Sequence, residues 1–282
     1  MTGIALRPSR EPLSDSGRRQ LARRRARLSS AAWFLSPFVV LVALWAVLVP
    51  ALDVSPRTFP SLASVWAVFT SGVTDGSLWT QVFASLARVG AGTGLAIAIG
   101  VPFGILMGIS RGVSGFFSPL LRFSVALAGI AWIPLATLWL GYGTGAVVFI
   151  VFNAVFFAVV YTTMLGVRQI STSLLRAARS LGAGPGRMFV EIYLPGAAPS
   201  IVTGLRMGMG FAWRGLIAAE IIATSSGLGY TLFLARQYYE TDVIILMMIT
   251  IGVLWLLMDR FLLAPLERRT VERWGARRQV GT

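Results

Sequence analysis

Three ionisable side chains stand inside one apolar run of the sequence, at about residues 201–223: Arg206, Arg214 and Glu220. Charged groups at membrane depth are costly, and they usually face the protein interior or water, so they are candidates for binding sites or ion pairs. On a helix, Arg206, Trp213 and Glu220 share approximately one face, whereas Arg214 lies roughly 80° away from Arg206. Arg206 and Glu220 would be about 21 Å apart along that helix, which is too far for them to pair.

Each of these side chains has more than one interpretation. Arg214, near the middle of the run, could attract an anion that crosses the membrane. Arg206 could instead reach the membrane surface or pack against a neighbouring loop, and Glu220 could form a structural ion pair with an arginine of another span. The candidates for a translocation pathway are therefore Arg206, Trp213, Arg214, Glu220, Asn153 and Trp132. The last two could equally serve helix packing.

Most catalytic chemistry is excluded by the residue types that are missing. All 25 basic residues are arginine, and the sequence contains no lysine, histidine or cysteine. Without lysine there is no phosphate-binding loop of the G-x-x-x-x-G-K-[ST] type, so ATP hydrolysis by that route is excluded. Without histidine and cysteine there is no zinc site of the usual kind and no Ser-His-Asp triad. We expect no catalytic residue, no metal and no cofactor in this chain.

The composition predicts an all-α membrane protein. Hydrophobic residues make up 56% of the 282 residues, charged residues only 13%, and the mean hydropathy is +0.74. Soluble domains carry about 25% charged residues, so this chain has too few charged residues and too many apolar ones for a surface in water. The net charge of +14 does not indicate nucleic-acid binding, because the arginines flank apolar runs and no base-reading module accompanies them.

Six apolar runs are long enough to be transmembrane helices, since about 20 helical residues cross the hydrocarbon core. They are expected at about 31–52, 86–109, 123–140, 146–167, 201–223 and 243–263, with the third interrupted at Pro134. A short amphipathic helix is expected at Ser61–Thr70. Gly100, Gly104 and Gly108 in the second run form a stripe of small residues suited to close helix packing.

The arginines predict the orientation of these spans, because positively charged connections stay in the cytoplasm. Eight arginines precede residue 31, one lies near residue 110, four lie in 168–198 and five follow Leu263, whereas the other side has only Arg57 and Arg236. Both termini are thus expected in the cytoplasm of a bacterial inner-membrane protein. The predicted parts are an arginine-rich tail at 1–30, a six-helix domain at 31–267 and a basic tail at 268–282, with membrane lipid around the whole.

The connection at 168–198 is long for a compact bundle, which indicates a function. Ser171–Leu181 reads as a helix that a serine can cap and that Gly182 can end with a positive φ. Gly184-Pro185-Gly186 predicts a turn, and a second short helix is expected at Arg187–Tyr193, ending before Pro195. The alternative is an interfacial helix whose arginines simply reach into water.

This loop resembles the cytoplasmic loop of the permease subunits of binding-protein-dependent ABC importers, which has the form E-A-A-x-x-x-G-x9-I-x-L-P. Six of its seven fixed positions agree: Ala177, Ala178, Gly182, Ile192, Leu194 and Pro195. Arg176 departs from the pattern, because the family typically has Glu there. The runs at 131–143, 204–213 and 218–230 look like the branch that imports aliphatic sulfonates, taurine or nitrate.

The resemblance implies a type I importer fold in which residues 168–198, here named the coupling loop, dock on a separate ATPase subunit. Two ATPase copies would use ATP and magnesium, a substrate-binding protein would deliver a small organic or inorganic anion, and a second permease copy would complete the path. Arg176 puts the usual acidic contact in doubt. The alternative function is a self-contained secondary transporter or channel, although no inverted repeat is evident. A membrane enzyme is a third possibility, for which few catalytic groups are left.

Overall fold

The computed structural model describes residues 36–51, 55, 58–127 and 129–275, and every regular element among them is helical. The chain divides into two compact units, residues 1–62 and 63–282. Outside the described residues lie the tail predicted at 1–30, the start of the first predicted span, and the part of the tail predicted at 268–282 that follows residue 275.

The first unit contains the apolar helix Ser36–Ala51. It is 16 residues long in its described part, and its Trp45 indole donates a hydrogen bond to the carbonyl of Pro60 over 3.0 Å. The Trp45 ring also meets Phe59 edge to face, with centroids 5.7 Å apart.

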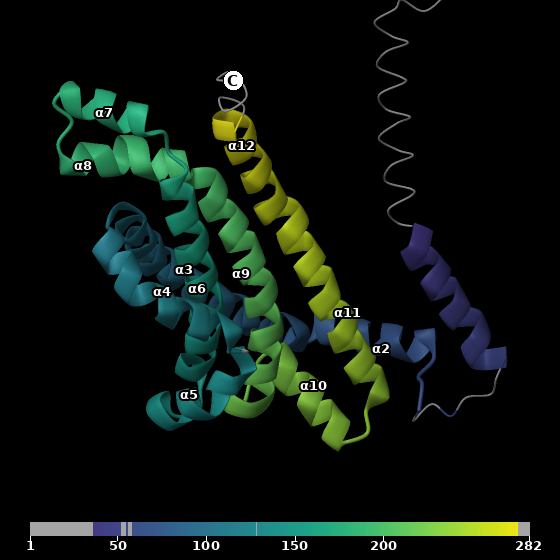
Figure 1. Ribbon diagram of the computed structural model, residues 1–282. Helices are drawn as coiled ribbons and strands as arrows, with labels where there is room; N and C mark the ends of the chain where they lie inside the picture. The colour runs from purple at the N-terminus through teal and green to yellow at the C-terminus, as the bar shows by residue number, and fades with distance from the viewer. Residues whose placement is uncertain (1–35, 52–54, 56–57, 128, 276–282) are drawn as a thin grey trace, which may run out of the picture. The chain divides into compact units, whose positions relative to one another are not determined.

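The second unit is built from helices only, in the part that the structure describes (Figure 1). The chain order is α2 (Leu62–Thr74), α3 (Ser77–Ile109), α4 (Arg111–Ala126), α5 (Ile133–Leu140), α6 (Thr144–Arg168), α7 (Thr172–Ser180), α8 (Pro185–Met188), α9 (Leu194–Ala223), α10 (Leu228–Gln237), α11 (Thr241–Met258) and α12 (Ala264–Gly275). A 3-10 turn, Gly129–Trp132, precedes α5, and π turns at Phe189–Tyr193 and Asp259–Leu263 precede α9 and α12.

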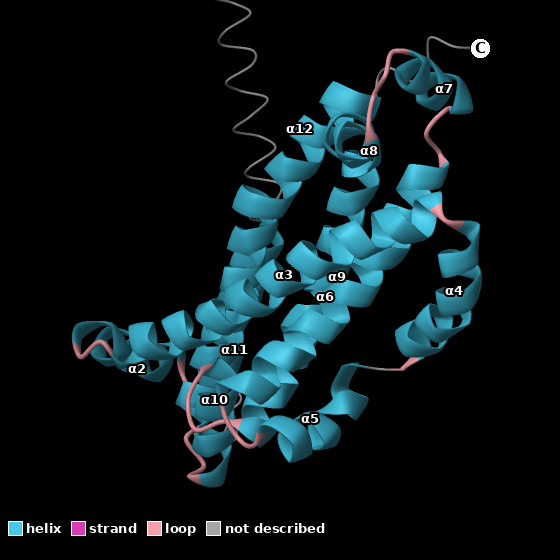
Figure 2. Cartoon of the chain, turned by 90° about the vertical axis from the view of Figure 1, so that its left-hand side faces the viewer, coloured by secondary structure: helices cyan, strands magenta, loops and turns pink. Residues whose placement is uncertain are grey.

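Helix α6 is central, because both α3 and α9 pack along it (Figures 1 and 2). The glycine stripe predicted in the second span makes the contact with α6: a Cβ added at Gly104 would stand 2.7 Å from Thr163 Cβ, and one at Gly108 would stand 2.6 Å from Val167 Cβ. On the other side of α6, a Cβ at Gly208 of α9 would lie 3.0 Å from Val155 Cα. Close approach of this kind stabilises helix association by van der Waals packing, because the hydrophobic effect does not drive helices together within lipid.

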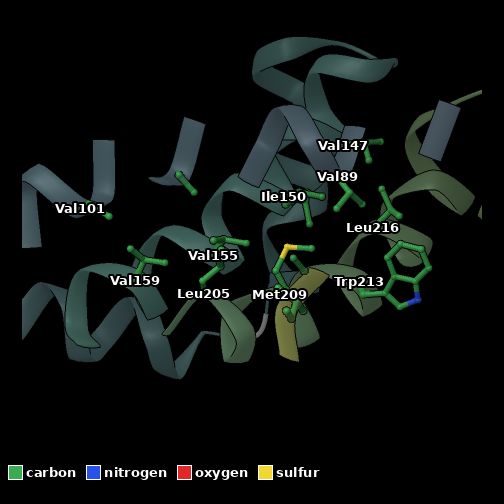
Figure 3. Close-up of a cluster of buried hydrophobic side chains, with 14 of the residues drawn as sticks. Val89, Val101, Val147, Ile150, Val155, Val159, Leu205, Met209, Trp213 and Leu216 are labelled. Atoms are coloured by element: carbon green, nitrogen blue, oxygen red, sulfur yellow. The ribbon is translucent and has the colours of Figure 1, made fainter. Parts of the chain in front are cut away.

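The core between these three helices consists of branched aliphatic side chains. Figure 3 shows residues of α3 (Val89, Val101), α6 (Val147, Ile150, Val155, Val159) and α9 (Leu205, Met209, Trp213, Leu216) directed toward one another. α7 and α8 lie at one end of the unit, whereas α5 and α10 lie at the opposite end, in both views (Figures 1 and 2). The two ends of the α3–α6–α9 core therefore carry different structures.

Four helical stretches of the described chain are long and apolar enough to cross a membrane: Ser77–Ile109, Thr144–Arg168, Pro185–Ala223 and Thr241–Thr270. A bent pair, Arg111–Ala126 with Gly129–Leu140, would make a fifth span. The fourth predicted span agrees with α6 to within two residues at its start. The short helix predicted at Ser61–Thr70 is α2. The second predicted span begins nine residues too late, since α3 starts at Ser77. The count of six spans remains a prediction.

The third predicted span is interrupted, but the interruption does not lie at Pro134 as predicted. The chain instead bends by 99° between α4 and the segment Gly129–Leu140, and Pro134 lies in the first turn of α5. Proline is well tolerated there, because the first helical N–H groups have no partner to lose. The break therefore falls several residues earlier in the chain than the proline suggested.

Candidate translocation pathway and coupling loop

Glu220 of α9 forms a buried ion pair with Arg88 of α3. Arg88 Nη1 lies 2.6 Å from Glu220 Oε1, and the two side chains are 5% and 0% exposed. The same guanidinium donates to the Ser226 carbonyl over 2.8 Å and to the Ser226 hydroxyl over 2.7 Å. This is the structural ion pair with another span that the sequence left open for Glu220. The pair joins two core helices to the turn after α9.

The carboxylate of Glu220 is also saturated by neutral donors. The Ser85 hydroxyl donates to it over 2.8 Å, and the Gly229 N–H donates to it over 3.0 Å. Ser85 in turn accepts the Leu228 N–H over 3.0 Å. Gly227 adopts a φ of +105°, and a Cβ there would collide with the carboxylate at 2.3 Å. The network thus holds the turn 224–229 against α3. The Glu220 carboxylate is fully buried and is not exposed to a translocation path.

Arg206, the second charged candidate, pairs with the C-terminal helices. Its Nε and Nη2 donate to the two carboxylate oxygens of Asp259 over 2.9 and 3.0 Å, a bidentate geometry. It also donates to Glu267 of α12. The ion-pair partners of Arg206 thus come from the C-terminal helices, and its side chain remains 39% exposed. It fastens α9 to the π turn Asp259–Leu263 and to α12.

Arg214 and Asn153, from two different helices, line one cavity of about 340 Å³. The wall comes from the end of α4, the 3-10 turn, α6 and α9: Ser124, Val125, Leu127, Gly129, Ile130, Asn153, Ala154, Phe157, Ala158, Phe211, Arg214 and Gly215. Most of these side chains are apolar, so the guanidinium and the amide are its strongest polar groups. Neither side chain hydrogen-bonds to any residue that the structure describes, and both are available to a ligand.

Trp213 and Trp132, the remaining pathway candidates, lie in the packed core instead. Trp213 is 6% exposed and its ring lies beside Trp255, with centroids 6.1 Å apart. Trp132 is half-buried and meets Phe149 edge to face. Neither residue lines the cavity with Arg214. The structure thus brings together two of the six candidates and places the other four in packing or ion pairs.

The coupling loop has the helix ends that its sequence predicts. The Ser171 hydroxyl accepts the Leu174 N–H at the start of α7. At the other end Gly182 has a φ of +79°; its N–H bonds to the Arg179 carbonyl, and the next N–H, of Ala183, bonds to the Ala178 carbonyl. These two bonds form a Schellman motif, which requires the left-handed conformation that glycine adopts readily.

The motif residues of the coupling loop divide between surface and core. Arg176, Ala177 and Gly182 are exposed, and the neighbouring Leu181 is 86% exposed. Ala178 and Ile192, by contrast, pack against the core. The first limb of the loop therefore presents small and apolar surface, and the second limb anchors the loop on the α3–α6–α9 core.

The sequence predicted that the second short helix of this loop ends before Pro195, and this prediction is wrong. α8 continues through the π turn Phe189–Tyr193 into α9, and the Leu194 N–H bonds to the Phe189 carbonyl. Proline lacks an N–H, and its ring would collide with a carbonyl four residues earlier in a regular helix. The wider π turn, directly before Leu194 and Pro195, opens the hydrogen-bond ladder where the proline enters it.

Arg88, the partner of Glu220 in the buried ion pair, was not among the residues predicted from the sequence. It stands in the apolar run of the second span, three residues after Ser85, and an arginine inside such a run is itself a signal. Its partner is 132 residues away in the sequence, so no local pattern could have paired the two.

The chain is similar to known proteins over most of its length. Residues 100–269 match the family described as binding-protein-dependent transport system inner membrane component. A protein of Brucella abortus (strain 2308) named as a probable ABC transporter permease is 39% identical over 203 residues, 72% of this chain and 80% of that protein.

Two relatives with named transport systems and one solved structure complete the comparison. The taurine transport system permease protein TauC of Escherichia coli (strain K12) is 32% identical, over 83% of this chain and 87% of its own length. The bicarbonate transport system permease protein CmpB of Synechococcus elongatus (strain ATCC 33912) is 36% identical, over 67% and 69%. The inward facing MetNI methionine ABC transporter has a chain of the same fold, with a TM-score of 0.54 and 18% identity, over 67% of this chain and 95% of that chain. The chain therefore belongs to the inner membrane components of binding-protein-dependent transport systems, the non-catalytic permease subunits of ABC importers.

Proposed function

We propose that this permease conducts a small anion along a path whose wall includes the cavity between α4, α6 and α9. The observation that carries the proposal is the position of Arg214, a cation without an ion-pair partner among the described residues, in a mostly apolar cavity. Such a charge attracts an anion more strongly where apolar walls lower the local dielectric. Asn153 adds an amide that can donate hydrogen bonds from the facing helix.

The chemistry of the relatives' named solutes supports an anion. Taurine carries a sulfonate and bicarbonate is itself an anion, so one feature of both is a negatively charged group of planar or tetrahedral oxygens. A guanidinium binds such groups through paired N–H donors. A binding protein selects the solute in such systems, and the permease needs only one weak general contact for release onward.

The partners belong to the same proposal. We infer that two ATPase subunits, which use ATP and magnesium, dock on the exposed limb of the coupling loop, and that α7 transmits their motion to α9 through the π turn. The exposure of Arg176, Ala177, Leu181 and Gly182 supports this docking surface. Arg176 calls for a neutral or acidic partner residue in the ATPase. A second copy of this chain would close the path beside Arg214, and an extracytoplasmic binding protein would deliver the solute.

The test compares Arg214→Gln with Arg122→Gln, which removes an exposed arginine of α4 outside the cavity. ATP-dependent uptake of labelled nitrate, bicarbonate and taurine would be measured in vesicles that contain the complete transporter and its binding protein. We expect Arg214→Gln to lower uptake of the transported anion roughly tenfold, the loss of one charge-assisted hydrogen bond.

Two controls distinguish a defect in solute passage from a defect in ATP hydrolysis. In Arg214→Gln, ATP hydrolysis stimulated by the binding protein should stay within about twofold of wild type. Arg214→Lys should restore part of the uptake, because lysine supplies the positive charge but not the paired N–H donors of a guanidinium. Equal uptake by Arg214→Gln and Arg122→Gln would remove Arg214 from the path.

A further inference from the structure

A second cavity, of about 480 Å³, lies where the helices α3 and α6 end beside the coupling loop. Gly108 and Ile109 come from the last turn of α3, and Val167 and Arg168 from the last turn of α6. Thr172, Leu175 and Arg179 come from α7. The cavity therefore stands at the end of two membrane-crossing stretches, where lipid head groups lie.

Three arginines line this cavity, and they come from three different elements: Arg111 from α4, Arg168 from α6 and Arg179 from α7. No acidic side chain lines it. Among the described residues, the side chains of Arg111 and Arg179 form no hydrogen bond or ion pair, and the Arg168 guanidinium donates from Nη2 to the Ser114 hydroxyl alone. Three like charges around one hollow repel one another, so the arrangement favours an anion between them.

Tyr193 gives an independent indication of a ligand. It lines the same cavity and is 6% exposed, yet its hydroxyl makes no hydrogen bond to any part of the chain that the structure describes. The fully enclosed polar side-chain atoms that lack a partner among the described residues do not include this hydroxyl, so it is open to the cavity and free to donate a hydrogen bond there. A ligand oxygen in the cavity would accept that hydrogen bond.

We propose that this cavity binds a phosphate group, as a phosphodiester of an anionic lipid or as free phosphate. Guanidinium groups bind tetrahedral oxyanions through paired donors, and three of them with a tyrosine hydroxyl can surround one phosphate. Basic pockets between membrane helices are known to hold anionic head groups. The cavity is separate from the one that contains Arg214, since the two share no residue.

The bound phosphate would tie α7 to the ends of α3 and α6. Arg179 belongs to α7, whereas Arg111 belongs to α4 and Arg168 to α6. The ligand would lie between these arginines. This consequence rests on the proposed role of the coupling loop, but the binding site itself does not.

The test measures lipid bound to the intact, purified transporter by native mass spectrometry after titration with phosphatidylglycerol or phosphatidylcholine. Wild type should retain phosphatidylglycerol in preference to phosphatidylcholine. Arg179→Gln should weaken the retention of phosphatidylglycerol roughly tenfold, because the substitution removes about the free energy of one charge-assisted hydrogen bond. Tyr193→Phe should weaken it several-fold, because the substitution keeps the buried ring and removes only the hydroxyl.

The matched controls are Arg122→Gln, an exposed arginine of α4 outside the cavity, and Tyr161→Phe, an exposed tyrosine of α6 outside it. Neither should change retention. A parallel arm titrates inorganic phosphate and follows the unfolding temperature: a rise that Arg179→Gln and Tyr193→Phe abolish, with no preference for phosphatidylglycerol, would assign free phosphate as the ligand. Retention and unfolding temperature that are the same in wild type and in both cavity variants would overturn the proposal. Transport is not among the readouts, so failure of the anion path would leave this result unaffected.

Discussion

Two charged side chains of α9 lie in opposite surroundings although only six residues separate them. Glu220 is fully buried and bonded to Arg88, Ser85 and Gly229. Arg214 is exposed and lines a cavity without a protein partner in the described chain. A buried charge with all its partners serves the fold, whereas a free charge at a cavity can serve a ligand.

The buried pair predicts strong coupling between Arg88 and Glu220. Arg88→Met alone leaves a buried carboxylate without its counter-charge, so we expect a loss of about 3–5 kcal/mol in unfolding free energy. Adding Glu220→Gln to Arg88→Met should recover part of that loss, because the amide still accepts hydrogen bonds from Ser85 and Gly229.

The exposed pair Arg187–Glu191, four residues apart on the coupling loop, is the internal standard for that measurement. Its double-mutant cycle should give only about 0.3–0.5 kcal/mol. Unfolding in mild detergent would be followed for both cycles. A coupling energy for Arg88 and Glu220 no larger than that of the exposed pair would contradict the structural role assigned to them.

Gly182 is required for its backbone conformation and not for space. Its φ is +79°, and a Cβ at this position would meet no atom within 4 Å. We expect Gly182→Ala to destabilise the end of α7 by about 1 kcal/mol, with Gly182→Asn closer to wild type because asparagine tolerates the left-handed region.

Gly184 provides the matched control for Gly182. It lies in the same loop with equally open space, but with an ordinary φ of −72°. ATP hydrolysis stimulated by the binding protein should fall several-fold in Gly182→Ala and remain near wild type in Gly184→Ala. Equal effects of the two substitutions would show that the Schellman motif is not what the loop needs.

At the scale of elements, the contact of α3 with α6 depends on glycines at particular positions. A Cβ at Gly104 would meet Thr163 Cβ at 2.7 Å and the Val160 carbonyl at 2.9 Å, whereas a Cβ at Gly94 would meet nothing within 4 Å. Gly104→Ala should therefore destabilise the chain by about 1–3 kcal/mol through overpacking. Gly94→Ala should be neutral or stabilise by about 0.5–1 kcal/mol, because alanine favours a helix. Thermal unfolding of both variants distinguishes these results, and the same shift for both would refute the close approach.

The elements that sequence could predict are those governed by local rules. α6 is a continuous apolar run, and α7 has a serine at its start and a glycine at its end, so both were predicted closely. The π turns before Leu194 and Ala264 were not predicted, because a proline ordinarily indicates that a helix ends. In both places the proline is the second residue after the π turn, so the chain uses one solution twice.

The elements that sequence could not predict depend on contacts far along the chain. The bend between α4 and α5 has no proline at its position, and the glycine after it, Gly129, is one of many in the chain. The candidate site was predicted in part for the same reason. Arg214 and Asn153 were singled out one at a time as polar groups within apolar runs, but only the packing of α6 against α9 places them at one cavity.

At the scale of the whole molecule, one chain accounts for only part of a transporter. Met207 and Phe211, two turns and one turn before Arg214 on α9, are 56% and 59% exposed. In a membrane these residues face either lipid or a second copy, and a cavity wall with a free arginine is unsuited to lipid. We infer that a second permease copy covers this face, so that two Arg214 side chains belong to one path.

We infer that this permease depends on a separate ATPase that docks on its coupling loop. The most direct measurement is to purify the intact chain from native membrane in mild detergent and quantify what accompanies it, comparing wild type, Gly182→Arg and Tyr142→Arg. Tyr142 is 80% exposed and lies between α5 and α6, and α5 lies at the end of the unit opposite α7 (Figures 1 and 2). We expect a stoichiometric ATPase with wild type and with Tyr142→Arg, and its loss from a folded Gly182→Arg. A chain that is purified alone and moves anions in liposomes without ATP would contradict this dependence on an ATPase.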